Sequence, residues 1–503
     1  MTQHIKIQII DPAYSKTMDE PSRKILRTLL FYEKDYWRKG RFHKEAHAYK
    51  KFLIDRYGNF LTGFLPRVQQ HAQQFNIRLS IVGQLETLPH QAPSLPGITF
   101  RDDQLQLIDK TIKHQRGVLK APARSGKTVV ASGIFSSFSG KKALFFCHTL
   151  ALLAQTETEF LKFGFDVGVF SGTRKELGRP ITLATHQSFV KIDPKDYCDA
   201  YDVIIIDECH HVSALSGNYS TILKNSLAPI RIGLTATPPE KKEKLMILEG
   251  LLGPIIGEIT SEEGLELGFL AKPKVSIRRI PSSTDLKRYK AYHEVYRQGI
   301  VLNRAYNRQV VLSAKEYILQ DMTVLILVNR VQHGFYLKGM FEKILPDLEV
   351  PFLCGGIDSD SQAEAKRLKK QLDKLKQVSP GKVTQTMDKI KGYIQEIKDF
   401  EKKIKDVSRE RDQLRIKLDN REIPCVIATN VWNEGINIPS LNVLINAGGG
   451  KSEVRSIQIG SRSLTACEGK EYGIIVDFFN PNHVKFIEHF GFRIAHYCEQ
   501  QWL

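Results

Sequence analysis

Apolar residues alternate with polar ones near the start of the chain and come in short unbroken runs farther along. Residues 6–10 and 78–82 alternate as half-buried strands do, and residues 22–31 have the spacing of an amphipathic helix. These elements predict a small α+β domain over residues 1–95. A Pro-, Gln- and Ser-rich stretch at 89–97 predicts a linker at its end.

Short apolar runs alternate with helical segments over residues 96–270, and a second series of the same kind follows over residues 271–503. The first series has its runs at 143–146, 167–170, 181–184, 203–206 and 232–234. The second has them at 324–327, 424–428, 443–445 and 473–476. Strands that alternate with helices form parallel sheets with helices on both faces. The pattern therefore predicts an α/β protein of three domains, two of which contain a parallel sheet.

A highly charged stretch interrupts the second series at about 358–419. Its apolar positions alternate spacings of four and three and then follow a heptad-like pattern: Leu368, Leu372, Leu375, Val378, Ile390, Ile394, Ile397 and Ile404. The turn sequence Ser379-Pro380-Gly381 separates the two groups. The spacing predicts an antiparallel helical hairpin, or coiled coil, inserted in the last domain. We interpret its charged outer faces as solvated surface rather than as a binding site.

Composition indicates which kind of partner the protein binds and in which cellular compartment it is expected. The 503 residues carry a net charge of +18, which favours a polyanion such as nucleic acid. No run approaches the roughly 18 apolar residues of a membrane-spanning helix, and the N-terminus has no apolar signal core. The seven cysteines are never spaced as C-x-x-C. We therefore expect reduced thiols, no zinc site, no disulfides and a cytoplasmic protein.

The segment between the first predicted helix and residue 51 interleaves aromatic and basic residues. These are Tyr32, Tyr36, Trp37, Arg38, Lys39, Arg41, Phe42, His43, Lys44, Tyr49, Lys50 and Lys51. Such a pattern suits stacking on bases and contact with phosphates. A solvated face over an aromatic core explains each single residue equally well.

The octapeptide Ala121-Pro122-Ala123-Arg124-Ser125-Gly126-Lys127-Thr128 has the chemistry of a phosphate-binding loop. Gly126 allows the turn that brings backbone N–H groups together, Lys127 reaches the terminal phosphates, and the Thr128 hydroxyl can bind Mg²⁺. A structural turn is the alternative. The apolar residues before the loop and the helical pattern after it favour the phosphate loop, because the mechanism needs a strand, a loop and a helix in that order.

An acidic pair, Asp207-Glu208, follows the apolar run at 203–206. Asp207 can hold the same Mg²⁺ through water, and Glu208 can orient or deprotonate the attacking water. Nucleotide should lie at the carboxyl ends of the parallel strands, where Lys127 and Asp207 are expected. ATP and Mg²⁺ are the expected cofactors.

The motifs together resemble those of superfamily 2 nucleic-acid helicases, across nearly the whole chain. Their two motor domains are RecA-like. Arg101 and Gln104 resemble the family's Q-motif, whose glutamine reads the adenine edge, and Phe100 is placed to stack on the base. Residues 144–149 are similar to motif Ia and residues 184–188 to motif Ib. The resemblance implies contacts to one nucleic-acid strand from His148, Thr149, Thr185 and His186.

The resemblance continues through the remaining motifs. Thr235-Ala236-Thr237 is similar to motif III, which couples hydrolysis to strand contacts, and His210 is expected to touch it; His211, His333 and His483 are expected to be structural. In the last domain the similar residues are Thr429, Asn430, Gly435 and Asn437 of motif V and Gln458 and Arg462 of motif VI. Thr429 and Asn430 are implied to contact nucleic acid, and the others to close over the nucleotide.

Two positions depart from the family pattern. Asn437 stands where an aspartate is usual, and Thr465 stands where motif VI normally ends in an arginine. That arginine would stabilise charge on the transferred phosphoryl group. We expect Arg462 to be the main arginine finger, with Arg455 or Arg124 as alternatives. We interpret Gly448-Gly449-Gly450 as a flexible turn rather than as a second phosphate site.

Within the superfamily the leading domain looks like that of phage UvsW-type helicases, whose motor halves are related to the XPB group. The resemblance implies a monomeric, ATP-dependent DNA helicase in a bacterial or phage-infected cytoplasm. It would act on branched, double-stranded or single-stranded DNA in branch migration, fork regression or R-loop unwinding, with recombination or replication proteins as candidate partners. Two alternatives stay open. One is the motor subunit of a restriction or defence complex, and the other is an ATP-binding DNA clamp with weak hydrolysis, which Thr465 suggests.

Overall fold

The computed structural model describes residues 3–39, 44–122, 124–268, 270–282, 286, 289, 291–354, 411–429, 438–450, 470, 472–499 and 501–503. These residues divide into two compact units, Met1–Gly264 and Leu265–Leu503. The expected helical hairpin lies outside the described residues except for its last part, which forms α15 (Arg411–Asp419). Among the helices of the described part, none is long and apolar enough to span a bilayer.

The first unit begins with a four-stranded sheet in the order β5-β2-β1-β6. Its strands are β1 (His4–Ile9), β2 (Tyr14–Thr17), β5 (Asn59–Leu61) and β6 (Arg78–Val82). The helices beside it are α1 (Glu20–Leu29), η1 (Thr62–Phe64) and α2 (Leu65–Gln74). Ile5 and Ile7 are fully buried, which explains the alternation seen in the sequence. The predicted strands at both ends of this domain and its first helix are confirmed.

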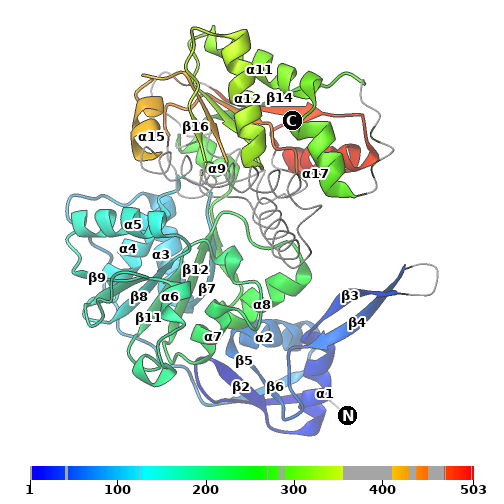
Figure 1. Ribbon diagram of the computed structural model, residues 1–503. Helices are drawn as coiled ribbons and strands as arrows, with labels where there is room; N and C mark the ends of the chain where they lie inside the picture. The colour runs from blue at the N-terminus through cyan, green and yellow to red at the C-terminus, as the bar shows by residue number, and fades with distance from the viewer. Residues whose placement is uncertain are drawn as a thin grey trace, which may run out of the picture. The chain divides into compact units, whose positions relative to one another are not determined.

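A two-stranded antiparallel ribbon interrupts this domain. It consists of β3 (Phe31–Lys39) and β4 (Lys44–Phe52), and Figure 1 shows it as an arm that projects from the N-terminal sheet. Its backbone carries the aromatic and basic segment. The ribbon starts against α8 (Lys242–Leu252), where the Lys34 ammonium lies 3.0 Å from the Glu243 carboxylate.

A seven-stranded, fully parallel sheet forms the rest of the first unit, in the order β13-β7-β12-β11-β8-β10-β9. The strands are β7 (Arg116–Lys120), β8 (Ala143–Cys147), β9 (Val167–Phe170), β10 (Ile181–Thr185), β11 (Val203–Ile206), β12 (Ile230–Thr235) and β13 (Ile255–Glu258). The five predicted strands of this domain are therefore confirmed. Their residues are almost entirely buried, as expected for strands covered on both faces.

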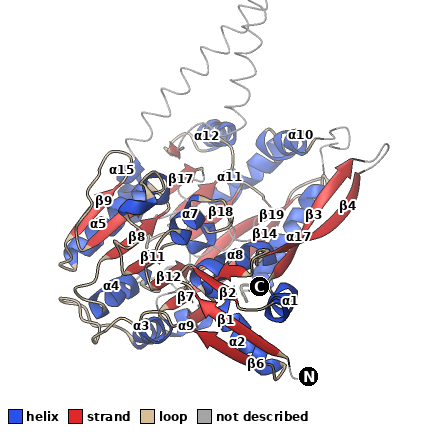
Figure 2. Ribbon diagram, turned by 90° about the horizontal axis from the view of Figure 1, so that it is seen from below, coloured by secondary structure: helices blue, strands red, loops and turns tan. Residues whose placement is uncertain are grey.

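Helices cover both faces of this sheet, as Figure 2 shows. The contacts place α3 (Asp102–His114), α4 (Lys127–Ser137) and α5 (Leu150–Lys162) together, and α6 (His186–Phe189), α7 (Asn218–Lys224) and α8 together. Three shorter helices complete the domain: η2 (Pro194–Asp196), η3 (Cys209–His211) and α9 (Ser261–Glu266).

The N-terminal domain packs directly on the parallel-sheet domain, through α8. The Arg67 guanidinium donates two hydrogen bonds to the Glu249 carboxylate, at 2.7 and 2.6 Å. Arg116 of β7 donates to the Pro12 carbonyl at 3.0 Å. One apolar core cluster runs from Ile5 through α8 to the strands of the parallel sheet. The two domains of the first unit therefore share a core.

The second unit contains a six-stranded parallel sheet in the order β14-β19-β18-β15-β17-β16. Its strands are β14 (Lys272–Arg279), β15 (Val324–Leu327), β16 (Phe352–Leu353), β17 (Cys425–Ala428), β18 (Val443–Asn446) and β19 (Tyr472–Phe479). Its helices besides α15 are α10 (Tyr292–Tyr296), η4 (Arg297–Val301), α11 (Arg304–Ile318), α12 (Val331–Ile344) and α17 (Val484–Glu499). The predicted strands of this series are confirmed, and the chain has two RecA-like parallel-sheet domains behind a small N-terminal domain.

Candidate functional site

The predicted phosphate loop joins the end of β7 to the start of α4. Gly126 has a left-handed backbone (φ 82°), and a Cβ there would lie 2.4 Å from the Gln104 amide nitrogen. Only glycine fits this position without displacing Gln104. The start of α4 has no side-chain cap, so the N–H groups of its first turn point outward for an anion. The local geometry therefore suits phosphate.

Two of the expected adenine-site residues brace this loop. The Gln104 amide donates to the Ser125 carbonyl at 3.0 Å, and its oxygen accepts from the Arg101 backbone N–H at 3.2 Å. The Arg101 guanidinium also donates to the Ser125 carbonyl, at 2.7 Å. The Phe100 ring packs against Gly133 of α4. These residues therefore set the shape of the loop, and reading of adenine by Gln104 stays a prediction.

The acidic pair lies beside the loop, as predicted from the order of the strands. Asp207 follows β11, which is separated from β7 only by β12. The Lys127 ammonium lies 3.8 Å from one Glu208 carboxylate oxygen, and Nδ1 of His210 lies 3.3 Å from the other. Glu208 has a left-handed backbone (φ 48°). Strain of this kind in a residue other than glycine is typical of functional sites.

The two carboxyl groups differ in their affinity for a proton. Burial, together with the negative charge of Glu208, raises the pKa of Asp207. Burial also opposes ionisation of Glu208, but Lys127 and His210 outweigh it and lower the pKa of Glu208. Glu208 is therefore the carboxylate that holds its charge, as a residue that orients or deprotonates water must. A divalent cation at Asp207 would favour the ionised form of that group as well.

The predicted coupling residues meet this pair. Nδ1 of His210 lies 3.1 Å from the Thr235 hydroxyl oxygen, which accepts a hydrogen bond from the Thr237 backbone at 3.1 Å. Ala236 lies between the two threonines. The Thr235 carbonyl accepts from the Ala121 backbone at 2.9 Å. The structure therefore connects the acidic pair, the Thr-Ala-Thr segment and the start of the phosphate loop.

The four residues predicted to contact nucleic acid in this unit lie at the carboxyl ends of β8 and β10. The His148 and His186 rings stack with centroids 5.6 Å apart. The Thr149 hydroxyl caps α5 by accepting from Leu152 N–H, and the buried Thr185 hydroxyl donates to Ser188. These two threonines thus have local structural contacts, and their contact with a strand stays a prediction. His211, expected from the sequence to be structural, stacks its ring on that of His148, a contact that the sequence does not reveal.

In the second unit most predicted site residues lie outside the described residues. These are Asn430, Gly435, Asn437, Gln458, Arg462 and Thr465, and Ala123 of the phosphate loop is also outside them. Thr429 is described: it follows β17, and its backbone donates to the Leu353 carbonyl at 3.0 Å. Arg124 is described and has a left-handed backbone (φ 70°). Thr128 lies in the first turn of α4, beside Lys127.

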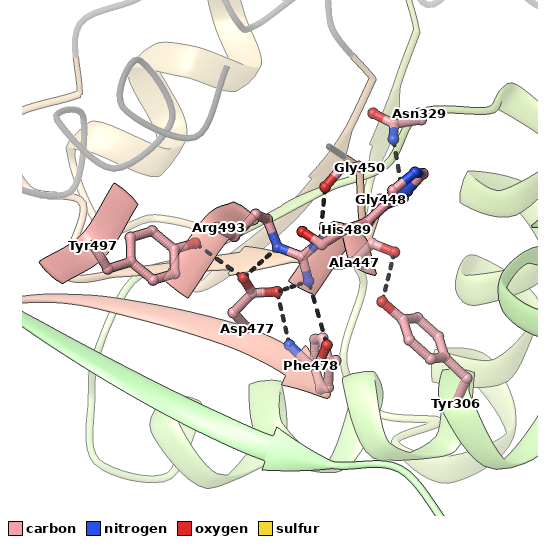
Figure 3. Close-up of polar contacts among 10 residues, drawn as sticks. All are labelled: Tyr306, Asn329, Ala447, Gly448, Gly450, Asp477, Phe478, His489, Arg493 and Tyr497. Carbon is pink, nitrogen blue, oxygen red and sulfur yellow. Dashed lines mark hydrogen bonds and ion pairs between the residues drawn. The ribbon is translucent and has the colours of Figure 1, made fainter. Parts of the chain in front are cut away.

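The triple-glycine segment is a turn, but its carbonyl groups are held rather than free. Figure 3 shows Tyr306 donating to the Ala447 carbonyl at 3.0 Å, Asn329 to Gly448 at 2.9 Å, and Arg493 to Gly450 at 2.7 Å. A Cβ on Gly448 would lie 2.8 Å from the Asn329 side chain. The interpretation as a flexible turn therefore misses the side chains that fix it. The interpretation that this segment is not a second phosphate site stays a prediction.

The comparisons with known proteins match parts of this chain. Residues 97–240 match the model of the family described as type III restriction enzyme, res subunit. A putative DNA 3'-5' helicase Rad25 of Halobacterium salinarum is 30% identical over 271 residues, which are 51% of this chain and 42% of the relative. The DNA 3'-5' translocase XPB2 of Sulfurisphaera tokodaii is 26% identical over 365 residues, which are 70% and 75% of the two chains.

The ATP-dependent DNA helicase uvsW of phage T4 is 23% identical over 287 residues, which are 53% of this chain and 55% of that relative. The chain thus spans less than half the length of the Rad25 relative and about three quarters of the XPB2 relative. Among solved structures, S. cerevisiae Dbp5 bound to RNA and ADP BeF3 has a TM-score of 0.51 at 13% identity, over 80% of this chain and 88% of that one. At this identity the likeness concerns the fold alone.

Proposed function

We propose that this chain is a superfamily 2 helicase, an ATP-driven motor that moves along DNA and remodels branched duplexes, because its motifs follow the order of that family and parts of the chain are similar to DNA helicases and translocases. The observation that carries the proposal is the contact sequence from Lys127 through Glu208 and His210 to Thr235. A motor needs its hydrolysis centre to be connected to the segment that leads toward the nucleic-acid strand. A protein that only binds DNA does not need this connection.

ATP and Mg²⁺ fit the residues present. Lys127 and the N–H groups at the start of α4 would hold the phosphates, and Thr128 and Asp207 would hold the cation. Bound Mg²⁺ neutralises charge that develops on the phosphate oxygens. Glu208, kept ionised by Lys127 and His210, orients the attacking water and accepts its proton. Arg462 remains our proposed arginine finger, on the strength of its motif.

DNA is the proposed track. The net charge of +18 favours a polyanion, and the relatives named above are called DNA helicases or translocases. Branched DNA as the preferred substrate, and with it branch migration, fork regression or R-loop unwinding, is proposed from the resemblance of the leading domain to that of phage UvsW-type helicases. We further propose that the chain acts as a monomer and that His148 and His186 contact one DNA strand.

A panel of labelled substrates tests the proposal. The purified chain would be incubated with forks, four-way junctions, R-loops and tailed duplexes, each with ATP or a non-hydrolysable analogue, and products would be resolved on native gels. We expect products from junctions and forks only with ATP, and none with Lys127→Ala. Remodelling by Lys127→Ala at the wild-type rate would overturn the proposal. Equal rates on all substrates would overturn the preference for branched DNA.

One finding favours a second function. The family model that matches residues 97–240 is named for a subunit of a restriction enzyme, so the chain is also a candidate motor of a restriction or defence complex. Such a motor would need a nuclease partner. Co-purification of a nuclease from the native source, followed by ATP-dependent DNA cleavage by the reconstituted complex, would favour this function over remodelling without cleavage.

A further inference from the structure

Four histidine rings lie in a row at the carboxyl edge of the first parallel sheet, here called the histidine column; two of the three neighbouring pairs are stacked, and the His210–His211 pair is tilted by 37°. His211 is the centre of this column, since its ring lies 3.6 Å from that of His148 at an interplanar angle of 2°. The His210 ring lies 4.2 Å from it on one side. Beyond His148 the column continues to His186, with centroids 5.6 Å apart. The four rings come from the loops after three different strands, β11, β8 and β10.

The two ends of the column touch different parts of the site. At one end, Nδ1 of His210 lies 3.3 Å from a Glu208 oxygen and 3.1 Å from the Thr235 hydroxyl. At the other end, the His186 ring lies 4.3 Å from the Tyr219 ring. The column therefore runs from the hydrolysis centre to the two loops that we propose to contact a DNA strand. His211 is the ring that joins its two halves.

The environment keeps the far end of the column neutral. Burial, and then the neighbouring His148 and His211, lower the pKa of His186 to about 4. A parallel pair of rings packs as flat plates. A parallel contact at 3.6 Å leaves no room between the His211 and His148 rings, so a shift of either must move the other or break the contact.

We propose that His211 is a positioning residue that couples the hydrolysis centre to the strand-contacting loop at His148. The inference rests on the proposed motor function. The His211 backbone N–H donates to the Glu208 carbonyl at 3.1 Å, and the His211 ring contacts that of His210, so the backbone of the acidic pair and the His210 ring both lead to His211. A shift of the Glu208 and His210 backbone during hydrolysis moves the His211 ring, and the stacked His148 ring transmits that shift to the loop.

The test separates ring stacking from ring chemistry. His211→Phe keeps a flat ring without nitrogen atoms, and His211→Ala removes the ring. The matched control is His71→Ala, which removes a histidine that stacks on Phe75 at 4.7 Å in α2, in the same unit. For each full-length variant one would measure kcat with and without saturating forked DNA, KM for ATP, DNA affinity and the melting temperature.

We expect His211→Ala to lower the ratio of DNA-stimulated to basal kcat by about 5-fold or more, the range typical of coupled sites. KM for ATP and DNA affinity should stay near wild type. His211→Phe should recover most of the ratio, and His71→Ala should not change it. A merely structural role would instead lower the melting temperature and both rates together.

Three results would overturn the inference: an unchanged ratio in His211→Ala, a His211→Phe ratio as low as that of His211→Ala, or a parallel loss of both rates. If His211→Ala does not fold, His211→Phe still tests the inference. This variant replaces only the ring nitrogens, so it must keep at least half of the wild-type ratio, and a lower ratio would overturn the inference. A wild-type chain that DNA does not stimulate at all would overturn the proposed function itself, and so is distinguishable from failure of this inference alone.

Discussion

Removing one partner of the buried ion pair between Asp477 and Arg493 should strongly destabilise the second unit. Asp477 ends the apolar part of β19 and is fully buried, and the Arg493 side chain from α17 is 4% exposed. The guanidinium donates to the two carboxylate oxygens at 2.6 and 3.0 Å. Tyr497 donates to the same carboxylate at 3.0 Å, as Figure 3 shows. Neither charge has access to water.

Breaking such a pair on one side leaves the other charge buried and uncompensated. That typically costs about 3–5 kcal/mol, whereas replacing both partners by apolar groups costs much less. We therefore expect Asp477→Leu and Arg493→Met each to lower the free energy of unfolding of this unit by about 3–5 kcal/mol. In the double variant Asp477→Leu with Arg493→Met, the loss of unfolding free energy should be smaller than the sum of the two single losses. We expect the difference to be at least about 2 kcal/mol.

Urea unfolding measures these differences. Because the two units need not unfold together, pulsed hydrogen exchange of peptides from β19 and α17 should be followed alongside circular dichroism. A control is Lys485→Ala, which removes the exposed ion pair with Glu488 in the same helix and should change little. Losses below about 1 kcal/mol in both single variants, or additive effects in the double variant, would refute the reasoning.

Two further predictions concern other buried contacts. Burial lowers the pKa of His333 to about 3, which is below its value in the unfolded chain. At a pH between the two pKa values, His333 therefore binds a proton in the unfolded chain but not in the folded chain. Stability is therefore complete above the unfolded pKa and falls by up to roughly 1.4 kcal/mol per pH unit below it. His333→Gln, which can still donate to Asn307, should reduce that slope in urea titrations at pH 7 and 5, and equal slopes would contradict the assignment. At Gly63 a Cβ would lie 2.2 Å from the Glu249 carbonyl, so Gly63→Ala should loosen the N-terminal domain and speed its proteolysis, with Gly172→Ala, where a Cβ would meet no atom within 4 Å, as the exposed control.

The sequence predicts the parallel sheets well because fully buried strands read as unbroken apolar runs. Ile204, Ile205 and Ile206 form the core of β11, and the position of Asp207 next to the phosphate loop follows from the parallel order. The β3–β4 ribbon escaped prediction because the described part of its sequence places charged, exposed residues such as Glu33, Lys50 and Lys51 where an apolar alternation would signal a strand. Its strands read as an undivided charged segment.

Buried charges are the second kind of miss. Arg231 in β12 is 1% exposed, and its guanidinium donates only to carbonyl groups among the contacts described, those of Leu223, Ser226 and Ala228. Arginine usually lies on the surface of a protein. Nothing in the local sequence shows that three carbonyl groups will converge on this guanidinium. The same holds for the Asp477–Arg493 pair and for the histidine column, whose members come from three separate segments of the chain.

The most direct test of the central claim is the rate of ATP hydrolysis with and without forked DNA, in the wild-type chain and in Glu208→Gln. The account predicts that DNA stimulates the wild-type rate. It also predicts that Glu208→Gln still binds ATP but hydrolyses it at least about 100-fold more slowly, because the base beside Lys127 and His210 is lost. Hydrolysis by Glu208→Gln at the wild-type rate, or a wild-type rate that no DNA changes, would contradict it.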